Sequence, residues 1–233
     1  MFLSWLYDNN EKSASLLTIY IVSNLISLIS VSFIKLICYS FSWDSINLKI
    51  KSLVKNNNKL EDYSTSLLHS VGLLFLLFAN FFIVNSNYFY RDTILYSMSY
   101  FIYDIYIIIE KKYSHLFLYH HILALVNLLI GYHNDIFLIP TIISLFIGEL
   151  SNPLQNTYKI CKIIDYKHTD IILKIFIYVF LFLRIIVFPL YWINSDIFSL
   201  KNSIYIIYNF ILLLGCIVSA VWAKDMFKIL KKK

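Results

Sequence analysis

Two adjacent histidines, His120 and His121, lie within an apolar stretch long enough to cross a lipid bilayer. The apolar stretches on either side of the pair contain two acids, Asp104 and Glu149. Ionisable side chains are costly at the depth of the lipid tails, so those that occur there mark candidate functional sites. An imidazole next to a carboxylate can take a proton from a substrate or attack it as a nucleophile. These four residues are the predicted catalytic residues.

The composition is that of an integral membrane protein. The 233 residues are 59% hydrophobic and 18% aromatic, with a mean hydropathy of +0.69, whereas soluble domains contain roughly 45 to 50% apolar residues. Cys38, Cys161 and Cys216 are far apart and odd in number, which supports neither a disulfide framework nor a thiolate metal site. We expect no cleaved signal peptide.

Transmembrane helices must position these side chains. A helix needs about 20 apolar residues to cross the hydrocarbon core, and the chain divides into seven such stretches, near residues 16–41, 67–84, 93–109, 115–131, 137–155, 171–193 and 203–223. The predicted fold is an all-α transmembrane bundle of seven helices, a first helix followed by a core of six. The predicted divisions are an N-terminal segment (1–59), the six-helix domain (60–225) and a basic tail (226–233).

The basic residues predict an orientation for this bundle. Alternate connections and the C-terminal tail contain 14 lysines, against three basic residues on the opposite side. The positive-inside rule then puts the N-terminus outside or in a lumen and the C-terminus in the cytosol. The net charge of +6 is explained as a topology signal, so we expect no nucleic-acid partner. The tail is similar to a dilysine retrieval signal, which favours the endoplasmic reticulum or another membrane of the host.

This orientation brings polar residues of three consecutive helices to one layer. At 1.5 Å per residue, Asp104 and Glu149 each lie ~8–9 Å from the cytosolic ends of their helices, and the histidine pair lies at a similar height. Nearby polar residues are predicted to bind substrate: Tyr100, Lys111, Lys112, Asn127, Asn152 and Asn156. Pro153 is predicted to kink or end its helix. The deeper Arg184 is predicted to be structural, in an ion pair or polar network.

Taken together, these motifs resemble the TLC domain, a family that includes ceramide synthases and membrane-lipid homeostasis proteins. The matching residues are Asp104, the pair His120 and His121, Arg184, and the run Glu149, Ser151, Pro153 and Asn156, which is similar to the family pattern E-x-S-x-P-x-x-N. The resemblance covers about residues 60–224. It implies a six-helix membrane domain of lipid metabolism, with the first helix outside it.

Two departures place the chain closer to the uncharacterised TLC-domain branch than to the ceramide synthases. Tyr158 stands where an arginine usually follows the motif asparagine. The H-D-x-x-D element of ceramide synthases is not matched by His133, Asn134 and Asp135 in spacing or depth. The resemblance therefore implies membership of the family without implying sphingolipid N-acylation.

Two functions of different classes fit these observations. One is a lipid acyltransferase that takes acyl-CoA from the cytosol as co-substrate, with His120 or His121 as base or nucleophile and Lys111, Lys112, Lys159 and Lys162 near the CoA phosphates. The other is a non-catalytic protein that binds lipids or sets membrane composition. A zinc-dependent hydrolase is disfavoured, because adjacent histidines diverge by ~100° around a helix. We expect membrane lipids as partners, no metal and no bound cofactor, and a homo-oligomer stays open.

Overall fold

The computed structural model describes residues 58–84, 86–198 and 202–231. The predicted first helix, residues 16–41, lies outside these ranges. Within them the secondary structure is helical, as predicted. The elements are α4 (Asn58–Ala79), η1 (Asn80–Val84), α5 (Asn87–Glu110), α6 (His115–His133), α7 (Asp135–Glu149), α8 (Asn152–Ile163), α9 (Thr169–Leu181), η2 (Phe182–Val187), α10 (Phe188–Asn194) and α11 (Ser203–Lys231), where η1 and η2 are π-helical.

Segments that continue one another give six helical rods in the described residues, in agreement with the predicted six-helix core. Five of them are long and apolar enough to cross a membrane: Asp62–Val84, His115–His133, Asp135–Ile163, Thr169–Asn194 and Ser203–Leu230. The chain is therefore a multi-pass membrane protein. The rod outside this set is α5, which contains Arg91, Asp92, Asp104 and several tyrosines. It nevertheless packs within the bundle, against α4, α6 and α7.

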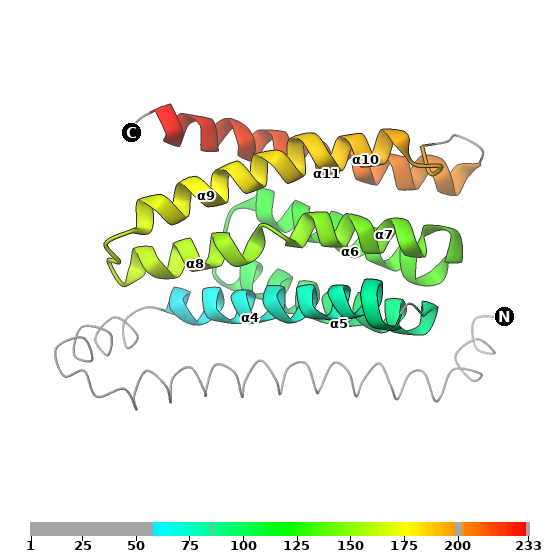
Figure 1. The fold of residues 1–233 in the computed structure, drawn as a ribbon, viewed down its shortest axis with the longest axis horizontal. Helices are drawn as coiled ribbons and strands as arrows, with labels where there is room; N and C mark the ends of the chain where they lie inside the picture. Colours follow the sequence, from blue (N-terminus) through cyan, green and yellow to red (C-terminus); the bar gives the residue numbers. More distant parts are fainter. Residues whose placement is uncertain (1–57, 85, 199–201, 232–233) are drawn as a thin grey trace.

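The rods are arranged in three layers (Figure 1). The helices α4 and α5 form one layer, α6, α7 and α8 the middle one, and α9, α10 and α11 the third. The middle layer joins the other two, since α6 contacts both α5 and α11, and α8 contacts both α4 and α9. Large apolar side chains cover the outside, among them Phe75 and Phe82, which are 70% and 74% exposed. Such a surface suits contact with lipid tails rather than with water.

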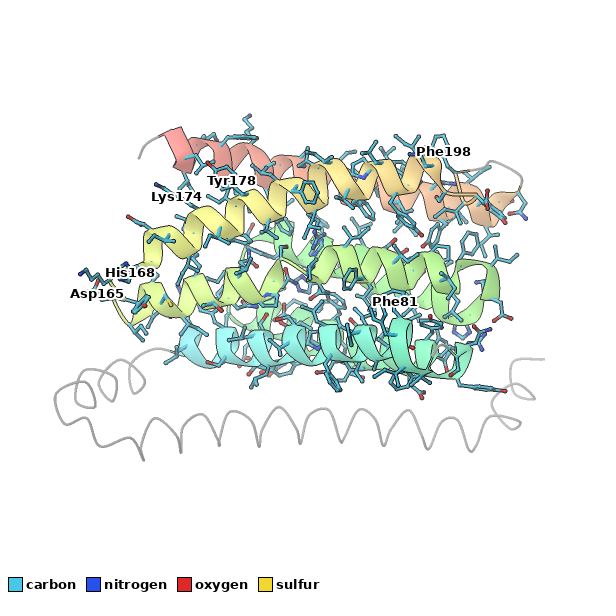
Figure 2. All side chains as sticks on the ribbon, viewed as in Figure 1. Phe81, Asp165, His168, Lys174, Tyr178 and Phe198 are labelled. Carbon is cyan, nitrogen blue, oxygen red and sulfur yellow. The ribbon has the colours of Figure 1, made fainter. Side chains whose placement is uncertain are left out.

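Lysines gather at one end of the bundle, which we call the basic end. It comprises the start of α4, the α5–α6 and α8–α9 connections and the end of α11 (Figure 1). Lys111 and Lys112 lie in the first of these connections and Lys167 in the second. Asp165 and His168 also lie at this end (Figure 2).

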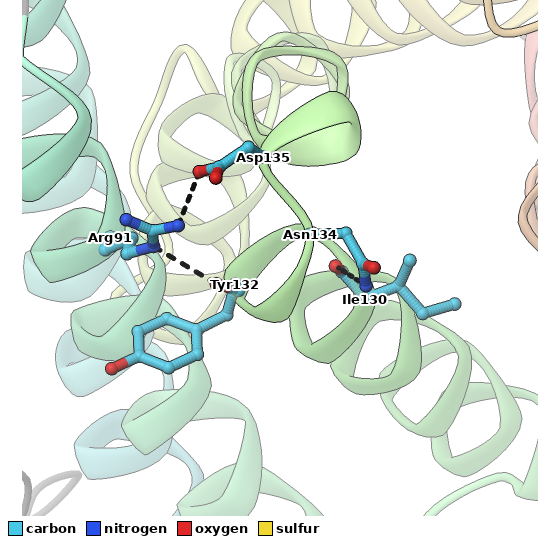
Figure 3. A network of polar contacts seen from close by, with 5 residues as sticks. All are labelled: Arg91, Ile130, Tyr132, Asn134 and Asp135. Carbon is cyan, nitrogen blue, oxygen red and sulfur yellow. Dashed lines mark hydrogen bonds and ion pairs between the residues drawn. The ribbon is translucent and has the colours of Figure 1, made fainter. Parts of the chain in front are cut away.

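A polar clasp closes the opposite end (Figure 3). Arg91 of α5 pairs with Asp135 at 2.6 Å between Nη2 and Oδ1, and its Nε donates to the backbone oxygen of Tyr132 at 3.2 Å. Asn134 caps the end of α6 by donating to the oxygen of Ile130 at 2.9 Å. The clasp ties the start of α5 to the α6–α7 connection. It thereby holds together α5, which contains Asp104, and α6, which contains the histidine pair.

The predicted fifth span is broken in the middle. The helix α7 ends at Glu149, Leu150 and Ser151 form a turn, and α8 begins at Asn152 with Pro153 in its first turn. Proline is tolerated in a first turn but clashes with the preceding turn of a continuous helix, which explains the position of the break. A second irregularity, the π-helical η2, contains Arg184 and precedes Pro189. Both irregularities border the cavities described next.

Candidate functional site

A cavity of about 230 Å³ lies in the half of the bundle nearer the basic end. His120, His121, Asp104 and Glu149 all line it. Three of the predicted substrate-binding residues, Tyr100, Asn152 and Asn156, line it as well, together with Asp62, Tyr113, Lys159, Arg184 and Trp222. Side chains from all three layers of the bundle therefore meet in one space, as the common depth of the predicted catalytic residues required. We call this space the main cavity.

His121 is held at both of its ring nitrogens. Its Nε2 lies 2.7 Å from Oδ2 of Asp104, and its Nδ1 lies 2.8 Å from the backbone oxygen of Phe117. Because a carbonyl oxygen can only accept, Nδ1 is the donor in that bond, and a second hydrogen lies between Nε2 and the Asp104 carboxyl group. The side chain is also buried, with 9% of the residue exposed. His121 therefore has no nitrogen available for a ligand unless one of these bonds breaks.

The ring of His120, unlike that of His121, is not held by hydrogen bonds from the described residues. It packs edge-on against His121 and Trp222, with centroids 5.4 Å and 4.9 Å away. Adjacent residues point ~100° apart around a helix, so one imidazole reaches Asp104 on α5 while the other turns to α11. His120 is thus the imidazole whose nitrogens are free to act on a ligand in the main cavity.

Glu149 and Arg184 both line the main cavity but do not form an ion pair with each other. Glu149 is 4% exposed and accepts a hydrogen bond from Nδ2 of Asn152 at 2.8 Å, across the α7–α8 break. Arg184 donates from Nη2 to the backbone oxygen of Gly148, and its Nε is buried without a hydrogen-bond partner. Within the described residues, Arg184 therefore contacts the end of α7 and does not form the ion pair that was one of its two predicted arrangements.

His69 packs against a residue of the main cavity, a placement that sequence reasoning missed. Although it stands near the start of a predicted span, it is buried, with 5% of the residue exposed. Its ring is sandwiched between Tyr100, with centroids 3.8 Å apart, and Tyr96, at 5.0 Å. Ser66, three residues earlier, accepts a 2.9 Å hydrogen bond from the cavity residue Asn156. This closeness in sequence is the signal that could have placed His69 near the main cavity.

The mouth of the main cavity contains an acid that the sequence did not single out. Asp62 accepts hydrogen bonds from Nζ of Lys111, 2.6 Å from each carboxylate oxygen, and from the Tyr113 hydroxyl at 2.9 Å. Burial, followed by the hydrogen bond and the charge of Asp62, raises the pKa of Tyr113, so its phenol stays protonated at neutral pH. Lys111 is therefore paired with an acid, Asp62, that lies 49 residues earlier in the chain.

The other predicted lysines are not equivalent. Lys159 lines the main cavity, with its ammonium group 4.8 Å from the ring centre of Tyr63. Lys112 and Lys162 are exposed and do not line the cavity. Of the four lysines considered for the CoA phosphates, Lys159 is thus the one that the fold brings to the cavity wall.

A second, smaller cavity of about 80 Å³ adjoins the first and shares Phe101, His120, Glu149 and Arg184 with it. We call it the deep cavity. The predicted substrate-binding residue Asn127 lies here and not in the main cavity. The remaining walls are mostly apolar, formed by Leu123, Ala124, Leu128, Leu145, Phe188, Ile211 and Leu212.

Among the described residues, no group of three or more His, Cys, Asp or Glu side chains is arranged to hold a metal ion. The geometry of His121 is one reason, since both of its nitrogens are already bonded within the protein.

Residues 17–228 match the model of the TLC domain (TRAM_LAG1_CLN8). The chain belongs to the TLC domain family. This multi-pass membrane family is linked to lipid metabolism. The match begins within the first predicted span, whereas the motifs in the sequence suggested a domain start near residue 60. No curated protein matches the chain in sequence.

Proposed function

We propose that this TLC-domain protein is an acyltransferase that moves an acyl group from acyl-CoA to the amine of a membrane lipid. The observation that supports this most is the imidazole of His120, which lines the main cavity and has no hydrogen-bond partner among the described residues. A general base must be able to reach the proton it removes. Of the two histidines, His120 meets this requirement and His121 does not.

The reaction needs one proton transfer in each direction. The lipid amine enters as the free base, and its nitrogen attacks the thioester carbonyl carbon. As the C–N bond forms, His120 takes the proton that the nitrogen loses, and it returns this proton to the CoA sulfur as the C–S bond breaks. The products are an amide and the CoA thiol, and His120 ends the cycle neutral.

Two cationic groups support the negative charges of this reaction. The guanidinium group of Arg184 lines both cavities and has an unpaired Nε–H, so it is suited to stabilise the oxyanion formed at the carbonyl. Lys159, in the wall of the main cavity, is suited to contact the phosphates of CoA. By the positive-inside rule, the basic end is proposed to face the cytosol, where acyl-CoA would enter. The endoplasmic reticulum is the proposed membrane, and no nucleic-acid partner is proposed.

The second candidate is a protein that binds membrane lipids without chemistry. It is favoured by one specific observation: Asp104, the acid that could orient a catalytic histidine, contacts His121 and not His120. On this alternative, His120, Glu149 and Arg184 would hold the headgroup of a lipid.

Reconstituted protein separates the two candidates. Purified protein in lipid nanodiscs is incubated with labelled long-chain acyl-CoA and a panel of amine lipids that includes a sphingoid base, and the products are identified by mass spectrometry. The acyltransferase proposal predicts an acylated lipid that the His120→Ala variant does not form. Absence of product from every amine, with unchanged lipids in cells that express His120→Ala, would reject the proposal in favour of lipid binding.

A further inference from the structure

The deep cavity has a polar group at an unexpected place. Asn127 lines it, its amide oxygen is buried, and the described residues offer no hydrogen bond to either end of the amide. Most of the surrounding side chains are apolar, including Leu128 and Leu145. Buried polar side chains in proteins are normally hydrogen-bonded, so an amide left unpaired in an apolar cavity indicates a missing partner.

The position of Asn127 indicates how far this partner lies from the reacting atoms. His120 belongs to both cavities, so an acyl chain whose carbonyl lies beside it can extend into the deep cavity. Asn127 is two helical turns further along α6. At 1.5 Å per residue this is a distance of about 10 Å, or about eight carbons of an extended chain.

The deep cavity ends soon after Asn127. One turn further along α6, a Cβ on Gly131 would clash with the side chain of Thr141, so the two helices are in contact there. Thr141 in turn hydrogen-bonds the hydroxyl of Tyr208 at 3.1 Å, and both residues are fully buried. A chain that enters past His120 therefore stops close to the asparagine.

On the basis of the proposed function, we propose that the deep cavity selects an acyl chain of medium length with a hydroxyl group about eight carbons from the carbonyl, recognised by Asn127. A plain alkyl chain would displace any water from the cavity and leave the amide unpaired. A site that is built to hydrogen-bond a hydroxyl discriminates strongly against the analogue that lacks it. Such a hydroxyl would donate to the amide oxygen of Asn127 and accept from its nitrogen.

Gly215 offers an independent way to test where the chain lies. It lines the deep cavity on α11, and a Cβ built at this position meets nothing within 4 Å. A Gly215→Leu substitution would thus fill the cavity without a clash of its Cβ with the present structure. This substitution is designed to close the deep cavity alone.

The test measures binding, so that it does not depend on acyl transfer. Decanoic acid, 8-hydroxydecanoic acid and 2-hydroxydecanoic acid are titrated into the purified full-length protein in nanodiscs. We expect the 8-hydroxy acid to bind at least tenfold more tightly than the other two. Asn127→Leu should reduce this ratio to about one, and Gly215→Leu should weaken the binding of all three acids.

The control is Asn194→Leu, which replaces an exposed asparagine that bonds the backbone of its own turn, at Leu190. It should keep the wild-type ratio. Equal binding of the three acids to the wild type, or a ratio that survives Asn127→Leu, would overturn the inference, as would undiminished binding to Gly215→Leu. The proposed function fails separately, by the absence of transfer from any acyl-CoA, and that result leaves the binding ratios intact.

Discussion

Two asparagines on neighbouring helices show how differently this bundle uses polar side chains. Asn209 of α11 is fully bonded: its side-chain oxygen accepts from Nε1 of Trp192 at 2.6 Å, and its nitrogen donates to the backbone oxygens of Ile197 and Tyr205 at 2.9 and 2.8 Å. Asn127 of α6 has no such bond. The first asparagine fastens α10 to α11, whereas the second faces a cavity. An unpaired polar atom that borders a cavity, more than a polar residue as such, therefore marks a candidate binding position.

The two histidines repeat this contrast within one turn of helix. His121 is bonded to α5 and to its own helix, and His120 is bonded to neither. A group whose bonds are all satisfied contributes to the fold, while a group without partners is available for a ligand. Substitutions at these and other paired residues test this division, in order of decreasing expected effect.

The largest effect is expected for His120→Ala. Loss of a general base typically lowers the rate by 10²–10⁴-fold, so we expect acyl transfer to fall by at least about 100-fold. Thermal unfolding in detergent should change little, because His120 makes no hydrogen bond in the described structure. Product formation and unfolding are measured on the same preparation. A large loss of stability with unchanged activity would reverse the roles assigned to the two histidines.

Asn209→Leu should lower stability and leave activity nearly unchanged, the opposite of the effect expected for His120→Ala. It leaves the Trp192 indole and two backbone oxygens without their partner in a buried place, and each unsatisfied group costs about 1–3 kcal/mol. We expect the free energy of unfolding in detergent to fall by about that amount or more. The activity of the protein that remains folded should stay near wild type. A matched Asn127→Leu variant should lose little stability, since Asn127 has no hydrogen bond to lose.

Asp104→Leu tests whether the acid holds His121 in place. Leucine can neither donate nor accept a hydrogen bond, so Nε2 of the buried His121 loses its partner. We expect a loss of stability of about 1–3 kcal/mol and a smaller loss of activity than with His120→Ala. Unfolding curves and initial rates provide the two readouts. If activity falls as far as in His120→Ala, Asp104 acts on the substrate directly.

The smallest effect is expected at the clasp of Figure 3. The Arg91 and Asp135 side chains are 29% and 74% exposed, so Asp135→Ala should cost about 1 kcal/mol or less. The difference from wild type should shrink in high salt, which screens exposed pairs. Unfolding at low and high ionic strength measures this. A loss that does not depend on salt would show that Asp135 matters through its position at the start of α7.

The sequence alone determined the class of protein, because the length and apolarity of a span follow from residue type and count. It also gave the common depth of Asp104, the histidine pair and Glu149, since depth depends on position along a helix. The interruption before Pro153 could be predicted for the same reason, as proline acts on the backbone next to it.

Which of these side chains have partners depends on the tertiary structure. The rotation of each helix about its axis, and the neighbours that it meets, depend on packing between segments far apart in the chain. This is why Lys111 is bonded to Asp62, 49 residues away, and why His69 lies between two tyrosines of α5. The same packing separated His120 from His121, and Asn127 from the main cavity. Depth is a local property of the sequence, but the pairing of hydrogen bonds is not.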